Sequence, residues 1–348
     1  MERRVPDVSF DETRAPAPGV PPYPAIFALG EAGREARRYH LVDTPSGLFK
    51  TALHDLLRRC PVWLAPAIAR CLAPLSRFRY RRRIFARRID FNLAELHADA
   101  PLEAVDLAAA SRRWWTGAGE VLAEYATLER LRSAGRVEIE GWEAVRSRLP
   151  ADMPVVFAAV HLGPFELVFE VVRNGLGRNI VATWQPEPSR HANEILSRLR
   201  SRYGCHIFPP GQRSARHLRR LVVGEGFDAL LFVDEVRDRQ IHLPAFGREL
   251  PTRGNAVVAV KLALKTGAPL VPVHVLRIGP ARYRFVASAP LDFDRDGADG
   301  DPVARGVAAL DRHFAPLVRA HLEQWYMLPE LRVPGFVAHP DRGPARDQ

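Results

Sequence analysis

The fold of this chain is decided by the stretch Val155-Val-Phe-Ala-Ala-Val-His-Leu-Gly-Pro-Phe-Glu166. Its first six residues are apolar without alternation and rich in valine, which is typical of a strand buried on both faces of a sheet. Gly163 and Pro164 cannot continue the strand, and the apolar residues after them recur three and four positions apart, as on one face of a helix. The stretch therefore predicts a buried strand, a tight turn and a helix, with His161 at the carboxyl end of the strand.

Strands and helices alternate through the segment 135–333 that surrounds this stretch. Further strands are predicted at 137–142, 180–184, 206–208, 229–233, 270–276 and 282–287, and helices at 189–203, 214–223, 255–266 and 302–325. Alternation of this kind is typical of a parallel sheet covered by helices. We therefore expect an α/β core with a central, largely parallel mixed sheet and helices on both of its faces.

Two regions precede this core and a short tail follows it. Residues 1–40 contain six prolines among charged residues, and we expect them to be disordered. Residues 41–134 are predicted to form a basic amphipathic helical region that lies on a membrane surface. Pro61, Pro66 and Pro74 interrupt its helical pattern. The polar tail, residues 334–348, is expected to be loose.

The most basic segment of the chain is 77–88, with seven arginines in twelve residues, interleaved with apolar and aromatic side chains. Together with a formal net charge of +10, it favours an anionic partner. Anionic lipid headgroups are the first interpretation, because the segment adjoins an amphipathic helix. Nucleic acid and a merely solvated helix face stay open as alternatives.

Composition and missing motifs narrow the possible chemistry. The three cysteines have neither disulfide-scaffold nor zinc-site spacing, so no metal site is expected and a reducing compartment is the default. The N-terminal residues do not read as a secretory signal, and no run of 18 apolar residues occurs. The sequence has no GxSxG elbow, no P-loop and no complete GxGxxG, which disfavours serine hydrolases, kinases and dinucleotide enzymes.

A histidine and a carboxylate lie on either side of the predicted turn. Glu166 falls in the first turn of the helix and can fold back to hold one nitrogen of the His161 imidazole. The other nitrogen could then take a proton from an attacking hydroxyl, at the strand end where open α/β sheets bind ligands. The alternative is a buried histidine with an unrelated surface glutamate.

Charged residues also follow the predicted strand at 229–233. If the strands are parallel, Asp234, Arg237 and Arg239 face the same rim as His161, where the arginines could bind a substrate phosphate. A surface salt-bridge network explains them equally well. The segment 251–255 precedes a helix, and a plain helix cap is favoured there over an anion site.

Several stretches together resemble one known family. His161-Leu-Gly-Pro-Phe-Glu166 is similar to the HX4(D/E) motif of glycerolipid-type acyltransferases, and its surroundings resemble the bacterial lipid A biosynthesis (late) acyltransferase family. The resemblance spans about residues 60–327 and rests on further similar segments: Asn92-Leu-Ala-Glu-Leu, Trp114 to Glu124, Phe246-Gly-Arg, Pro251-Thr-Arg-Gly, Leu262 to Pro272 and Glu323-Gln-Trp-Tyr326.

The resemblance implies a mechanism and its site residues. His161 would be the general base and Glu166 its orienting partner, in transfer of a fatty acyl chain from an acyl carrier protein or coenzyme A thioester without a covalent acyl-enzyme. Gly163, Asp234, Arg237 and Arg239 are the substrate-binding candidates. Where the family usually has an arginine, this chain has Trp184-Gln185-Pro186, so Arg190 and Arg198 are candidate replacements.

The resemblance also implies partners and a location. We expect a membrane lipid acceptor, an anionic membrane surface, no cofactor and no nucleic acid, with the protein peripheral on the cytoplasmic face of the bacterial inner membrane. We also expect the chain to lack the N-terminal membrane anchor that is usual in the family. Two other functions stay open: a non-catalytic basic protein that binds membranes or nucleic acid, and a thioester hydrolase in which His161 activates water.

Overall fold

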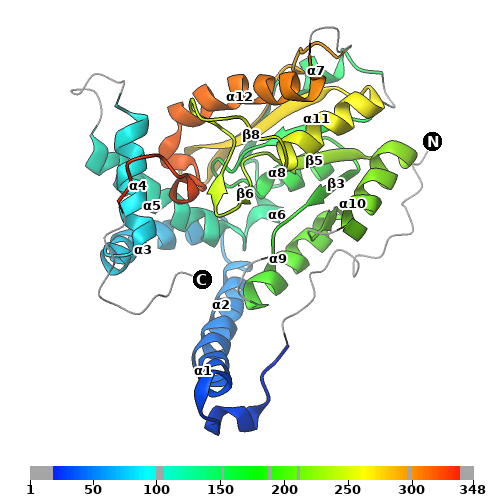
Figure 1. Ribbon diagram of the computed structural model, residues 1–348. Coiled ribbons are helices and arrows are strands. Elements are labelled where there is room, and N and C mark those ends of the chain that lie inside the picture. Colours follow the sequence, from blue (N-terminus) through cyan, green and yellow to red (C-terminus); the bar gives the residue numbers. More distant parts are fainter. Residues whose placement is uncertain are drawn as a thin grey trace.

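A computed structural model describes residues 19–98, 106–150, 153–186, 190–209, 212–295 and 300–337. At its centre is a seven-stranded sheet in the order β1-β9-β8-β2-β5-β3-β4 (Figure 1). The strands are β1 (Val137–Glu140), β2 (Val156–Ala159), β3 (Ile180–Thr183), β4 (His206–Phe208), β5 (Asp228–Phe232), β8 (Leu270–Gly279) and β9 (Arg282–Ala287). All neighbours are parallel except β8 and β9, which confirms the predicted mixed, largely parallel sheet.

Helices cover both faces of this sheet, as predicted (Figure 1). Successive residues of β2 point to opposite faces, because side chains alternate along a strand. Val156 and Ala158 share a buried cluster with α10 (Gln212–Arg219), α11 (Asn255–Thr266) and α12 (Pro302–Ala320). Phe157 and Ala159 share another with α7 (Trp142–Arg146), α8 (Leu167–Glu170) and α9 (Arg190–Tyr203). Burial on both faces explains why the sequence of β2 is apolar without alternation.

Three helices precede the core, and the second and third of them pack against it. They are α3 (Leu64–Tyr80), α4 (Ile84–Leu96) and α5 (Leu107–Glu124), followed by the short α6 (Leu128–Leu131). Ile89 and Leu93 of α4 and Trp114 of α5 belong to the same buried cluster as α11 and α12. The helical nature of the region 41–134 is thus confirmed where it is described, and its boundary with the core stays a prediction.

An arm made of the first described helices projects away from the sheet (Figure 1). It comprises a 3-10 helix (Tyr23–Phe27), α1 (Gly30–Arg38), a π-helical turn (Tyr39–Asp43) and α2 (Thr44–Leu57). The sequence predicted disorder up to residue 40, whereas the structure has helices from Tyr23 onward. The guanidinium of Arg37 on α1 holds the 3-10 helix against α1 by donating hydrogen bonds to the carbonyls of Ile26 and Ala28. Residues 1–18 and most of the tail predicted to be loose, from residue 338, lie outside the described residues.

Within the described ranges, no helix combines the length and apolarity that crossing a bilayer requires.

Candidate active site

The site lies where β2 and β5 end side by side. The two strands are parallel, with Ala159 opposite Phe232, and the Val233 amide donates to the Ala159 carbonyl. The chain leaves β2 through His161 and leaves β5 through Asp234. Because parallel strands end at the same edge of the sheet, residues far apart in sequence meet at this rim.

His161 and Asp234 form a hydrogen-bonded pair. The imidazole Nδ1 lies 2.7 Å from Asp234 Oδ1, and the backbone amide of His161 donates to Oδ2 at 2.8 Å. The indole N–H of Trp325 donates to the same Oδ2 at 2.9 Å. An ionised carboxylate only accepts hydrogen bonds, so this geometry favours the tautomer of the neutral imidazole that has its proton on Nδ1 and its lone pair on Nε2. Asp234 is fully buried, and these three N–H donors replace the water that it has lost.

Glu166 has a different partner from the one predicted. It is the N-cap residue of α8 and is buried, and its carboxylate forms an ion pair with the guanidinium of Arg200 on α9. Burial would lower the pKa of Arg200, but the adjacent Glu166 carboxylate outweighs it and raises that pKa. The expected contact between Glu166 and the imidazole is therefore corrected, because a buried guanidinium requires the Glu166 charge while Asp234 holds Nδ1.

The turn after His161 depends on a glycine. Gly163 has a φ of +52°, and a Cβ atom there would lie 2.8 Å from the Val275 carbonyl oxygen. Its amide donates to the Gln324 carbonyl at 3.0 Å. In this structure Gly163 shapes the backbone around the histidine, and contact with a substrate stays a prediction.

A cleft of about 1190 Å³ opens beside His161. Its volume exceeds the roughly 300–1,000 Å³ of ordinary small-molecule sites. The rings of Phe165 and Phe232 lie 4.5 and 4.3 Å from the imidazole, measured between ring centroids. Much of the remaining lining is apolar: Phe169, Trp184, Leu196, Leu218, Val236, Val258, Leu262, Tyr326 and Met327. The cleft therefore suits a ligand with a long apolar part next to a basic nitrogen.

The predicted arginines are distributed unevenly around this cleft. Arg237 lines it, and its Nη1 is buried without a hydrogen-bond partner. Arg239 is not among the lining residues: it sits at φ +62° in the turn between β6 (Val236–Arg237) and β7 (Gln240–Ile241). Arg190 donates to the Tyr39 hydroxyl at 3.3 Å, and Arg198 pairs with Glu194 on the outside of α9; neither lines the cleft.

The sequence prediction missed Arg200, which does line the cleft. Its guanidinium lies 4.8 Å from the ring centroid of Trp184, the residue before Gln185. The signal was helical spacing, because Arg200 follows the buried Leu196 by four residues and so lies on the inward face of α9.

The N-terminus of α11 is occupied by the protein's own carboxylate. Glu235 Oε1 accepts a hydrogen bond from the Asn255 amide at 2.6 Å. Burial raises the pKa of Glu235, although this amide and Arg237 oppose the shift. The segment 251–254 itself supplies no side-chain cap, because the N-cap residue is Gly254, and the accepting side chain comes instead from Glu235 on the rim after β5. Among the described residues, no group of three or more potential ligands could hold a metal ion.

A family model described as bacterial lipid A biosynthesis acyltransferase matches residues 112–331, which is more than half of the chain. The matched segment contains β2, β5, α9 and the segment 324–326, and therefore every residue described above around His161. A comparison with curated proteins found no match.

Proposed function

Because the chain belongs to the bacterial lipid A biosynthesis acyltransferase family, we propose that it moves a fatty acyl chain from an acyl thioester to a hydroxyl of a membrane glycolipid, with His161 as general base. Membership makes the chain an acyltransferase of the lipid A type. The donor, the acceptor and the residue roles are the parts that we propose. The observation that supports them is the His161–Asp234 pair at the edge of a large apolar cleft.

Asp234 prepares the base for proton transfer. With Nδ1–H held by the carboxylate, Nε2 of His161 accepts the proton of the acceptor hydroxyl as its oxygen attacks the thioester carbonyl. The imidazolium formed in this step is stabilised by the adjacent Asp234 charge. The tetrahedral intermediate then expels the thiolate, which takes the proton back from Nε2. The products are an acyl ester and a free thiol, and no acyl-enzyme forms.

Arg200 is the cation that we assign to the developing oxyanion. Its Nη1 is buried and has no hydrogen-bond partner, while its Nε and Nη2 bind Glu166. A donor that is fixed in advance and desolvated stabilises a negative oxygen more strongly than water does. In this proposal Glu166 acts by holding Arg200, and not by orienting the imidazole.

The lining of the cleft suits an acyl chain and a phosphate. Its aromatic and aliphatic side chains would cover the hydrocarbon. Arg237, Lys261 and Lys265 also line the cleft and would bind the phosphate of a phosphopantetheine arm or of the lipid headgroup. Of the predicted phosphate ligands, only Arg237 keeps this proposed role, because Arg239 does not line the cleft.

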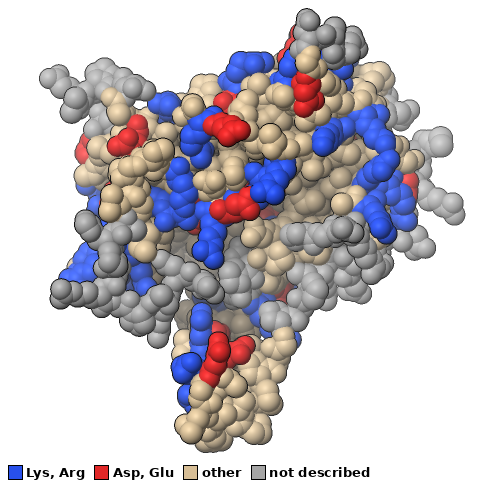
Figure 2. Space-filling model, viewed as in Figure 1, with Lys and Arg blue, Asp and Glu red and all other residues tan. Residues whose placement is uncertain are grey.

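We propose that α3 holds the protein on an anionic bilayer surface. Four exposed apolar residues recur three and four positions apart along it: Ile68, Leu72, Leu75 and Phe78. Exposed arginines at 79, 81, 82 and 83 follow directly. Figure 2 shows basic side chains at the position of α3, and an arm whose visible surface is mostly uncharged. An apolar stripe next to arginines is typical of helices at a bilayer interface. In this proposal the interface is the cytoplasmic face of the membrane.

The first test is mass spectrometry of lipids from cells that express the wild type, His161→Ala or the control variant His97→Ala. We expect a lipid that gains one acyl group in the wild type and in His97→Ala, and not in His161→Ala. Circular dichroism must show that His161→Ala is folded. Equal acylation by His161→Ala and the wild type would show that His161 is not the general base. Release of free fatty acid without an acylated lipid would indicate a hydrolase.

A further inference from the structure

We propose that Trp325 is a positioning residue: its indole N–H fixes the Asp234 carboxylate and thereby sets the tautomer and orientation of His161. This inference rests on the proposed function. The contact itself is direct, since Trp325 Nε1 lies 2.9 Å from Asp234 Oδ2, and both side chains are fully buried. Asp234 Oδ1, its other oxygen, receives the imidazole Nδ1–H.

The segment 324–326 is attached to the backbone around His161. The Tyr326 amide donates to the His161 carbonyl at 2.9 Å, and the Gly163 amide donates to the Gln324 carbonyl at 3.0 Å. Leu162 and Trp325 form an isolated antiparallel bridge. The segment thus runs beside 161–163 like a very short strand. The Trp325 side chain is therefore held in a fixed position relative to the backbone of His161, the proposed base.

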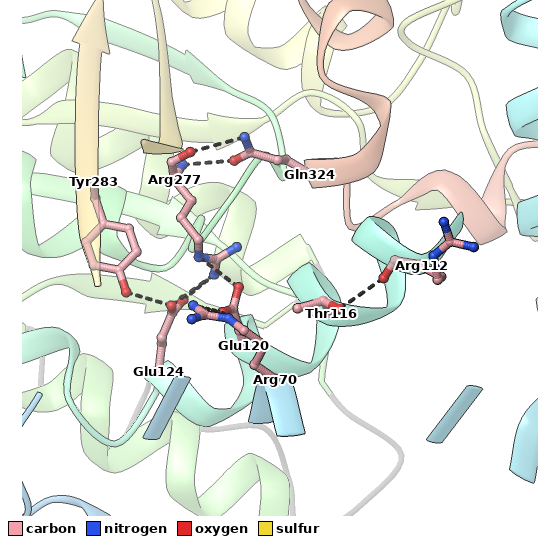
Figure 3. Close-up of polar contacts among 8 residues, drawn as sticks. All are labelled: Arg70, Arg112, Thr116, Glu120, Glu124, Arg277, Tyr283 and Gln324. Carbon is pink, nitrogen blue, oxygen red and sulfur yellow. Dashed lines mark hydrogen bonds and ion pairs between the residues drawn. The ribbon is translucent and has the colours of Figure 1, made fainter. Parts of the chain in front are cut away.

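Gln324 anchors the segment to β8 (Figure 3). Its Oε1 accepts the Arg277 amide at 2.8 Å, and its Nε2 donates to the Arg277 carbonyl at 3.2 Å. The Arg277 guanidinium binds the buried carboxylates of Glu124 and Glu120. Burial alone would lower the pKa of Arg277, but these two carboxylates outweigh it and raise that pKa. Arg277 therefore stays charged and holds the end of β8 against α5.

The indole ring has little freedom to move. Trp114 on α5 donates its own indole N–H to the Trp325 carbonyl at 2.9 Å, and the Phe246 ring packs against Trp325 at 5.8 Å between centroids. A donor fixed in this way before the reaction is preorganised and needs no rearrangement during proton transfer. Without it, Oδ2 would keep only the His161 amide as a donor. The carboxylate could then turn, and Nδ1 would lose its fixed acceptor.

The test is Trp325→Phe in the full chain, which removes the N–H and keeps an aromatic ring. We expect kcat to fall about tenfold to hundredfold, the loss associated with one hydrogen bond to a buried charge, while KM changes little. Nitrogen NMR of ¹⁵N-histidine protein, with the His161 signals identified by their absence from His161→Ala, should show Nδ1–H alone in the wild type. In Trp325→Phe the two ring nitrogens should become more alike. Trp142→Phe, at another buried tryptophan, is the matched control and should change neither reading.

Two further measurements separate positioning from packing. In an Asp234→Asn background, Trp325→Phe should cause no additional loss of kcat, because its partner has already been removed. If Trp325→Phe does not fold, benzothienylalanine at position 325 keeps the bicyclic ring without the N–H. Unchanged His161 nitrogen signals in a folded variant would overturn the inference, whether or not kcat fell. The NMR reading needs no substrate, so it stands even if no acyl transfer is found.

Discussion

At the scale of single residues, two buried carboxylates lie next to the turn that carries His161, and each is neutralised differently. Asp234 receives three N–H donors, and Glu166 receives the guanidinium of Arg200. Glu166 and Arg200 side chains are only 2% and 12% exposed. Removing one partner of a buried pair leaves an uncompensated charge away from water and lowers the free energy of unfolding strongly. Removing one partner of an exposed pair changes that free energy little.

Glu166→Gln should lower the free energy of unfolding by about 3–5 kcal/mol, because Arg200 would remain buried without a counter-charge. Urea unfolding measures this change. The control is Glu194→Gln on α9, whose pair with Arg198 is 48% and 44% exposed and should be worth less than about 1 kcal/mol.

Two outcomes bear on the assignment of Glu166 to Arg200. The double variant Glu166→Gln/Arg200→Met should recover part of the lost stability, because both buried charges are then absent. The His161 tautomer seen by NMR should be unchanged in Glu166→Gln. Equal losses in Glu166→Gln and Glu194→Gln would contradict the role of the buried pair.

At the scale of elements, α3 presents different chemistry on different sides. Its buried side faces α5, and Arg70 on α3 binds the buried carboxylate of Glu120 on α5 at 2.6 Å. Its exposed stripe carries large apolar side chains that no described element covers. An exposed apolar stripe followed by arginines favours a lipid surface over solvent.

Leu72→Glu combined with Leu75→Glu should reduce binding to vesicles that contain anionic lipid by more than about tenfold, since burying a leucine contributes about 1.5–3 kcal/mol. Vesicle flotation is the measurement. Ile278→Glu, at an exposed apolar residue near the end of β8, is the control and should bind like the wild type. Binding that is equal in all three proteins would place the membrane contact elsewhere.

At the scale of the whole molecule, the stability of the fold depends on pH through buried histidines. Burial lowers the pKa of His274, on β8, from 6.5 to about 4, and the nearby His313 and His321 add to the shift. The unfolded chain therefore takes up a proton at a higher pH than the folded chain does. The contribution of neutral His274 to the free energy of unfolding is fully present above pH 6.5, and it is lost as the pH falls from 6.5 to 4.

For this one group, lowering the pH from 7 to 5 should cost about 2 kcal/mol of unfolding free energy. His274→Leu should reduce the loss measured by urea unfolding at the two pH values. The Nδ1 of His274 is buried and has no hydrogen-bond partner, so leucine gives up no hydrogen bond there. An equal pH dependence in wild type and variant would show that other groups cause the loss.

Much of the sheet could be predicted from the sequence because its strands are short, apolar and separated by helical spacing. The predicted strands of the core are all present, and α11 has its predicted bounds, Asn255–Thr266. The β6–β7 ribbon was missed because strands of two residues have no periodicity. Its turn places Asp238 and Arg239 at positive φ without the glycine or asparagine that usually signals such a hairpin.

The sequence alone determined the α/β class, the position of His161 at a strand end and the end of that strand at Gly163 and Pro164, since each follows from periodicity or backbone preference within a few residues. Only the tertiary structure decided the partners of the buried charges. Asp234 is 73 residues from His161, and Trp325 is 91 residues from Asp234. In the local sequence, Glu166 is the carboxylate close to the histidine. A buried charge must be neutralised or hydrogen-bonded, however, and the packing of distant strands and helices decides which group does so.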